Sequence, residues 1–366
     1  MAAQQQRLAF AATALALTVS LLAPPPSPSL AREHLQDPPN SAMAHFLRTA
    51  DDDAFIKFLR FDRHTFQLIL TEFAPLFEAT PLRPTEGEGI YPIQGRVQVR
   101  ALDSPQTLAL ILRFLAAGTT SDDQLLQMGI VQATRSQYLR QGLLTLLTVL
   151  RNWPPARITM PTVDEARQMA AAAAQWDERI QGCFGVIDGT VHRRERPADD
   201  QIQRLHYNGM DSCHAAKSLV VYGFTGEILY IVCNDYGSSS DAGMLQWSGF
   251  LRILQQYPPD LCIAGDSAFP ASANLIRVLD NDELAQFPQV RSDLEALNGI
   301  LKGIRMAAEW GLKQWKGCWR VFHQDLPAES DRDPVYRAIF EISARLTNVR
   351  VRLMGISQIF NVFQRT

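Results

Sequence analysis

The chain has 366 residues, of which 46% are hydrophobic and 20% charged, a globular composition that excludes a largely disordered protein. Its formal net charge of −3 gives no global attraction to nucleic acid, so a DNA-binding surface would have to be a local patch. The five cysteines form no C-x-x-C pair or zinc-type cluster, which indicates buried free thiols in a reducing compartment.

The N-terminal segment, residues 1–41, combines an apolar run with a Pro- and Ser-rich stretch that we interpret as a linker. Residues 8–23 resemble the hydrophobic core of a signal peptide and are short for a membrane span. A working signal would make the protein secreted or membrane-anchored, whereas a misassigned start codon or an Ala-rich helix would look the same. We expect no stable membrane association.

Residues 42–160 are predicted to form a small all-α, helix-turn-helix-like domain. Residues 54–77 have apolar side chains at helical spacing, and a Pro- and Gly-containing loop follows. Between residues 104 and 150 the sequence predicts three more helices, which begin at Ser104 as the N-cap, at Ser121 and at Thr134. Gly118 and Gly129 mark the turns between them.

This helical block has two interpretations. Its spacing fits a helix-turn-helix, in which Arg135, Gln137 and Arg140 would contact phosphates or bases. Alternatively, the helices form a bundle that only supports the following domain.

Residues 161–366 alternate between strand and helix patterns. We predict a helix at 164–180, a strand in CFGVIDGTVHRRE, and two strands joined by a Phe-Thr-Gly-Glu turn. Helical spacing in AGMLQWSGFLRILQQY precedes a buried strand in LCIAGDSAF, and helices are expected at 271–279, 297–317 and 334–353. This order predicts a mixed α/β domain around one central sheet.

Three acidic residues are candidate metal ligands. Asp188 and Asp266 each follow buried strand residues and lie beside a glycine, and Glu309 lies among apolar residues on an otherwise basic helix. Carboxylate oxygens are the ligands that Mg²⁺ or Mn²⁺ prefers, and such ions support in-line phosphodiester hydrolysis by a two-metal mechanism. Alternatively, the aspartates are turn or cap residues and Glu309 is an i, i+4 partner of Arg305 or Lys313.

The blocks GVIDGT, GSSSDAGML, GDSAFP and NGILKGIRMAAEWGLKQWKGCWRVF resemble the PIF/Harbinger transposases and their domesticated nuclease relatives. The resemblance, over about residues 108–353, implies an RNase H-like DDE catalytic domain that cleaves DNA with divalent metal. It places the catalytic, metal-binding acids at Asp188, Asp266 and Glu309.

The resemblance has further implications and some departures. It adds Asp241 as a possible fourth metal-binding acid, with an N-cap role as the alternative. It also implies a Myb-like DNA-binding partner protein, a possible homodimer and a nuclear location. However, Val191 separates Thr190 from His192, and HYNGMDS keeps only part of a family motif.

Two basic groups flank these acids and are candidate phosphate contacts. The first comprises His192, Arg193, Arg194, Arg196, Arg204, His206 and Lys217, and the second comprises Lys302, Arg305, Lys313, Lys316 and Arg320. Trp315 and Trp319 are candidates either for stacking on unpaired bases or for core packing.

Together these features predict a DNA endonuclease or transposase. A catalytically silent descendant that acts as a DNA- or protein-binding module is the alternative. No P-loop or G-x-S-x-G motif supports a nucleotide triphosphatase or a serine hydrolase.

Overall fold

A computed structural model describes residues 30–82, 100–118, 121–328 and 334–363. The predicted apolar run at 8–23 lies outside these residues. None of the helices in the described ranges combines the length and hydropathy needed to cross a membrane. The chain divides into two compact units. The first comprises residues 1–149 with 332–338, and the second comprises residues 150–331 with 339–366.

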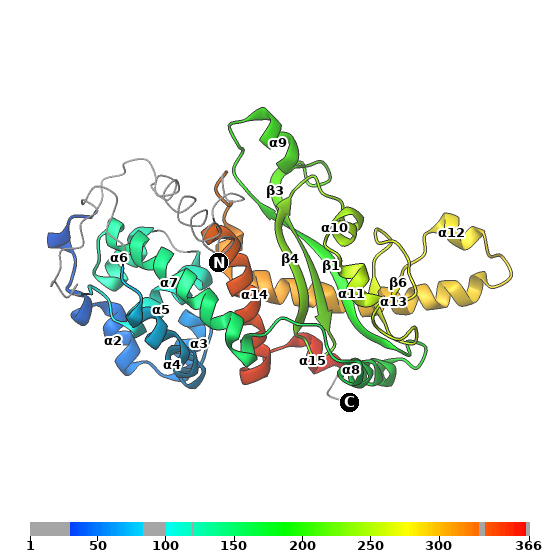
Figure 1. Cartoon of the computed structure of the whole chain (residues 1–366), viewed down its shortest axis with the longest axis horizontal. Helices are drawn as coiled ribbons and strands as arrows, with labels where there is room; N and C mark the ends of the chain where they lie inside the picture. Colours follow the sequence, from blue (N-terminus) through cyan, green and yellow to red (C-terminus); the bar gives the residue numbers. More distant parts are fainter. Residues whose placement is uncertain (1–29, 83–99, 119–120, 329–333, 364–366) are drawn as a thin grey trace, which may run out of the picture. The chain divides into compact units, whose positions relative to one another are not determined.

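The first unit is helical (Figure 1). Its elements are η2 (Arg32–His34), η3 (Pro38–Asn40), α2 (Ala42–Thr49), α3 (Asp52–Leu59), α4 (Arg63–Ala79), α5 (Ser104–Ala117), α6 (Ser121–Met128) and most of α7 (Gln132–Asn152). The predicted helical segment at 54–77 is two helices, because Arg60 adopts a left-handed conformation (φ 72°) that ends α3.

Two sequence interpretations in this unit are wrong in detail. The second half of the predicted linker is folded, since Gln106 Nε2 donates to Pro38 O at 2.8 Å and Ser41 is fully buried. Asp103, and not Ser104, caps α5, because Asp103 and Gln106 form a reciprocal capping box. Gly118 ends that helix as predicted.

The turn between α6 and α7 requires glycine. Gly129 has φ +68°, and a Cβ built there would lie 2.1 Å from Gln36 O. Arg135, a candidate DNA contact, donates instead from Nε to Gln124 Oε1 at 2.6 Å, and burial lowers its pKa to about 10. A DNA-reading helix-turn-helix therefore stays a prediction.

The second unit confirms the predicted mixed α/β domain. After η4 (Pro154–Ala156), its elements are α8 (Val163–Trp176), β1 (Cys183–Arg193), α9 (Asp200–His206), β2 (Tyr207–Asn208), β3 (Cys213–Gly223), β4 (Ile228–Tyr236), α10 (Asp241–Trp247), α11 (Phe250–Leu254), β5 (Cys262–Gly265), β6 (Leu275–Arg277), α12 (Asn281–Ala285), α13 (Arg291–Cys318), η5 (Arg320–His323), α14 (Pro334–Met354, in this unit from Ile339) and α15 (Gln358–Phe363).

One sheet organises this unit. Its strand order is β2-β3-β1-β5-β6, with β4 paired to β3. Strand β3 is antiparallel to both β1 and β4. β5 runs parallel to β1, and β6 runs parallel to β5. The helix predicted at 271–279 is wrong, because its Leu-Ile-Arg run pairs with β5 as an additional strand, and periodicity cannot assign so short a run.

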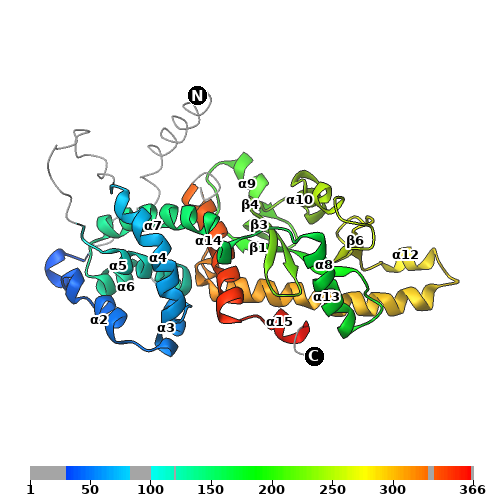
Figure 2. The same ribbon diagram turned by 60° about the horizontal axis from the view of Figure 1, so that its bottom comes forward.

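Helices cover both faces of the sheet. Buried side chains of α8, α10 and α11 pack with Ile187, Leu219 and Ile263 on one face. On the other face His192 contacts the ring of Trp315 on α13, with centroids 5.4 Å apart. The view in Figure 2 shows α13 running along the sheet. Side chains that alternate along β1 therefore face different helices.

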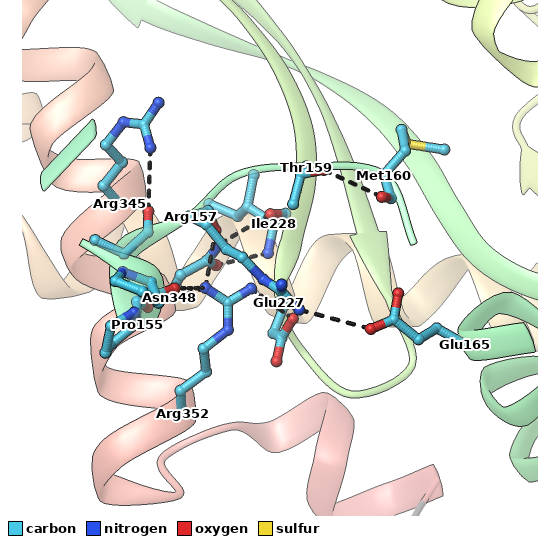
Figure 3. Close-up of polar contacts among 12 residues, drawn as sticks. Pro155, Arg157, Thr159, Met160, Glu165, Glu227, Ile228, Arg345, Asn348 and Arg352 are labelled. Carbon is cyan, nitrogen blue, oxygen red and sulfur yellow. Dashed lines mark hydrogen bonds and ion pairs between the residues drawn. The ribbon is translucent and has the colours of Figure 1, made fainter. Parts of the chain in front are cut away.

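A polar clamp joins α14 to the β3–β4 hairpin (Figure 3). Asn348 accepts from Ile228 N at 2.7 Å and donates to Ile228 O at 2.9 Å and to Arg157 O at 2.8 Å. Arg352 pairs with Glu227 at 2.8 Å and donates to Pro155 O at 2.9 Å. The clamp satisfies backbone groups of the hairpin and of the segment before α8.

We expect Asn348→Leu to lower the free energy of unfolding by about 2–3 kcal/mol, because it leaves the buried Ile228 backbone without its partner. The change is measured from the denaturant midpoint. The exposed Gln358→Ala serves as the matched control, with an expected change below about 0.5 kcal/mol. Equal midpoints for both variants would contradict the role of the clamp.

Candidate active site

Asp188 lies on β1, and Asp266 directly follows the neighbouring parallel strand β5. Val186 of β1 is the register partner of Ala264 of β5, and each aspartate follows two residues later, Asp188 within β1 and Asp266 directly after β5. Since side chains alternate along a strand, the Asp188 carboxylate points to the face that α13 covers, and the charge of Asp266 acts on it electrostatically. The register therefore brings together two of the acids predicted from sequence.

Burial gives the Asp188 carboxyl an unusual pKa. Desolvation raises it from 3.8 to about 6, and the negative charge of Asp266 adds to the increase. A hydrogen bond from Gly189 N, 2.8 Å long, and the positive charge of Arg305 act in the opposite direction. Within the described residues neither Asp188 nor Asp266 has an ion-pair partner at 4 Å or less. A cation would compensate this charge.

Glu309, the third candidate, lies on α13 and has a basic partner. Arg305 Nη2 is 3.2 Å from Glu309 Oε1, one helical turn away, and the two side chains are 31% and 32% exposed. This contact is the i, i+4 pair considered from the sequence. The positive charge of Arg305 also acts on Asp188, where it lowers the pKa.

Asp241, the possible fourth acid, lies on the opposite face of the sheet. A Cβ built on Gly189 would be 2.5 Å from Asp241 Oδ1, and Gly189 points away from the side chain of Asp188. Asp241 Oδ1 is 2.8 Å from Lys217 Nζ, which also donates to Ser239 O at 2.9 Å. The alternative N-cap role is wrong, because the side chain of Ser240 caps α10.

The residues fit a divalent cation in part. Two adjacent carboxylates without a basic partner are a suitable start for Mg²⁺ or Mn²⁺. However, no three or more His, Cys, Asp and Glu side chains in the described ranges lie close enough together to hold a metal ion. Glu309 therefore does not form a three-ligand group with the two aspartates in this structure.

Much of the predicted basic surface is used inside the fold. His192, Arg194 and His206 are buried, and Arg194 donates to the backbone of Ala328. Lys316 donates to Val191 O at 2.8 Å, and burial lowers its pKa. These interactions favour structural roles for these residues over phosphate contacts.

Trp315 and Trp319 belong to the core. Both are fully buried, and their indole nitrogens donate to Ser343 and Thr347, each at 2.9 Å. The core-packing alternative is therefore confirmed. None of the five cysteines forms a disulfide bond, and the predicted burial holds for Cys183 and Cys262, whereas Cys213, Cys233 and Cys318 are partly exposed.

Residues 187–348 match the family model of the DDE superfamily endonucleases. No curated protein and no solved structure matches the chain. The match supports the superfamily, and the mixed sheet of the second unit fits its RNase H-like fold. All four acidic candidates lie within the matched segment, and the helical first unit lies outside it, apart from the short segment at 332–338.

Sequence reasoning missed one basic partner at this site. Lys217 was assigned only to a general basic surface, whereas it pairs with Asp241; Arg305 was considered both for a basic surface and as the i, i+4 partner of Glu309 that the structure shows. The i, i+4 spacing gave a signal for Arg305, but the strand register that sets Lys217 beside Asp241 has none in the sequence.

We expect Asp188→Asn to change how stability depends on pH. Because the folded-state pKa of Asp188 is raised from 3.8 to about 6, the wild type loses stability as pH rises through this interval. In metal-free buffer the variant should match the wild type near pH 4 and exceed it by on the order of 2 kcal/mol near pH 7. Denaturant titrations across this range measure the difference.

The control is Asp164→Asn, since the Asp164 side chain is 90% exposed. Its stability should follow the wild type throughout. A pH profile of Asp188→Asn parallel to that of the wild type would contradict the buried, charged state inferred for this carboxylate.

We expect Asp241→Asn to lower stability by on the order of 2 kcal/mol, because it leaves the largely buried Lys217 ammonium without its counter-charge. Thermal and denaturant unfolding measure this loss, and Lys217→Met in the same background should restore part of it. A loss of Mn²⁺ affinity at unchanged stability would show instead that Asp241 is a metal ligand.

Proposed function

We propose that this chain is a divalent-metal-dependent DNA endonuclease of the transposase type, related to the PIF/Harbinger group. The observation that carries the proposal is the adjacent Asp188 and Asp266 pair, which lacks a basic partner among the described residues and lies in a segment matching DDE endonucleases. The ordered blocks named from the sequence support the finer assignment.

In this proposal Asp188, Asp266 and Glu309 are the catalytic acids that hold Mg²⁺ or Mn²⁺. The bound metal would activate water and stabilise the leaving oxygen of a phosphodiester by a two-metal mechanism. The strand register fixes the two aspartates, while α13 supplies the glutamate from the helix covering the same face. Asp241 is the fourth candidate ligand, and its ion pair with Lys217 favours a structural role.

One observation favours the second candidate function, a catalytically silent DNA- or protein-binding module. Glu309 is paired with Arg305, and no set of three ligands is assembled in the described part of the chain. Retention of all three acids in the matched segment favours the enzyme.

We further propose DNA as the substrate and a nuclear location. A Myb-like partner protein would supply targeting, the helix-turn-helix-like block would contact DNA, and a homodimer would join two DNA ends. The support for these points is the family resemblance, with no contribution from the net charge of −3.

The full chain should nick supercoiled plasmid with Mg²⁺ or Mn²⁺ and not with EDTA. We expect Asp188→Asn, Asp266→Asn and Glu309→Gln each to reduce cleavage at least about 100-fold, because each removes a proposed ligand charge. Gel quantification of nicked plasmid measures this.

The matched control is Asp260→Asn, an exposed carboxylate two residues before β5, which should cleave like the wild type. Binding of DNA by folded wild-type protein without metal-dependent nicking would favour the silent module. Nicking that survives all three substitutions would place the active site elsewhere.

A further inference from the structure

Two buried thiols meet at the beginning of the central strand pair. Cys183 is the first residue of β1 and Cys262 is the first residue of β5, and the two are register partners. Cys262 N donates to Gly182 O at 2.8 Å, and a Cβ built on Gly182 would clash with Asp260 O. The two backbones therefore approach each other closely directly before both cysteines.

The arrangement of the two cysteines fits a disulfide bond. Adjacent strands lie about 4.7–4.9 Å apart, within the Cα separation of about 4.4–6.8 Å that disulfides span. Paired residues of adjacent strands also direct their side chains to the same face of a sheet. A side-chain hydrogen bond joins the thiols of Cys183 and Cys262. The bond can therefore form without a change in the register of β1 and β5.

The two thiols are chemically unequal. Cys183 is fully buried and also donates from Sγ to Gly185 O at 3.5 Å, whereas 8% of Cys262 is exposed. The hydrogen bond between the thiols lowers the pKa of Cys262, and the same bond together with burial raises the pKa of Cys183. Since the thiolate is the reactive form of cysteine, Cys262 reacts with an oxidant first, and Cys183 is positioned to react with the product.

The other three cysteines are distributed differently. Cys213, Cys233 and Cys318 lie on β3, β4 and α13, and all three are partly exposed. In the described sheet, Cys183 and Cys262 are the one pair of cysteines that strand register sets opposite each other. Oxidation governed by exposure and oxidation governed by pairing therefore lead to different products.

We propose that Cys183 and Cys262 form a peroxide-responsive modification site, in which oxidation joins β1 to β5 by a disulfide bond. The Cys262 thiolate attacks hydrogen peroxide, becomes a sulfenic acid and releases hydroxide, which takes up the proton that the thiolate had lost. The Cys183 thiol then attacks the sulfenic sulfur, and the S–S bond forms as the S–O bond breaks and water leaves. Two thiols are thereby oxidised, and one peroxide is reduced to two water molecules.

The bridge would join the strand pair that positions the candidate site. Asp188 lies on β1 and Asp266 directly follows β5, so both aspartates are downstream of the bridged residues. Formation of the bridge needs neither a metal ion nor DNA. It can therefore be measured independently of the proposed function.

The test is peptide mass spectrometry of the folded full chain after treatment with hydrogen peroxide, with the remaining thiols alkylated in denaturant. We expect a cross-linked pair of peptides that contain Cys183 and Cys262, about 2 Da lighter than the two reduced peptides together and separable by dithiothreitol. Alkylation of these two residues should fall in parallel, at least about fivefold, because both sulfur atoms enter one product.

Two variants and an unfolded sample serve as controls. In Cys183→Ser the bridge should be lost and Cys262 should be oxidised further to a sulfinic acid, because no neighbouring thiol can react with the sulfenic acid. Cys318→Ser, which removes a partly exposed thiol, should form the bridge to the same extent as the wild type. In denaturant the preference for this pair should disappear, since the strand register brings the thiols together.

Three outcomes in the folded wild type would overturn the inference, whatever the stability of the variants. The first is full alkylation of Cys183 and Cys262 while the partly exposed cysteines are oxidised. The second is a disulfide between any other two cysteines as the main product. The third is conversion of Cys262 to a sulfinic acid while Cys183 stays reduced, because Cys183 would then be too far away to react.

Discussion

The parallel pairing of β1 with β5 is the constraint on which the candidate site depends. Backbone hydrogen bonds fix Val186 opposite Ala264, and this register brings the two carboxylates close enough to interact electrostatically. The hydrophobic packing on the other face, through Ile187 and Ile263, holds that register. Strand pairing and core packing thus offset the unfavourable free energy of bringing two negative charges together. The raised pKa of Asp188 reflects this unfavourable energy.

Around this pair the fold distributes positive charge in two ways. Lys217 is enclosed and serves to attach α10 to the sheet through Asp241, whereas Arg305 lies at a more exposed position on α13. Proximity to an acidic cluster therefore does not by itself define the structural role of a basic residue. Its burial and its number of acceptors decide whether its ion pair is a fixed part of the fold or a weak contact near the surface.

The sequence was sufficient for the elements with strong local signals. The apolar runs of β1 and β5, the β3–β4 hairpin and the long amphipathic helix around Glu309 all lie where periodicity predicts them. It was insufficient for β6, a run of three residues whose strand conformation depends on the free edge of β5. The observed helix N-caps, Asp103 and Ser240, also differ from the residues expected. Several neighbouring residues can supply the side-chain oxygen that caps a helix.

Prediction of the site residues was likewise limited to what local sequence signals can show. Strand-end acids beside glycines drew attention to Asp188 and Asp266, but the face on which each side chain lies depends on register. Asp241 was added to them only through the family resemblance, and it lies on the other face, against Gly189. The buried tryptophans and the enclosed basic residues show that composition near an acid cannot separate contacts to DNA from contacts within the fold.

The alternation along β1 has a genetic consequence. Asp188 and Gly189 are consecutive, yet one presents a carboxylate towards α13 and the other leaves room for Asp241 beneath α10. Gain or loss of a single codon upstream in this strand would exchange the two faces, with an acid directed at Asp241 and a glycine directed at the face that α13 covers. Lineages of this protein should therefore accumulate substitutions in β1 while its length stays constant.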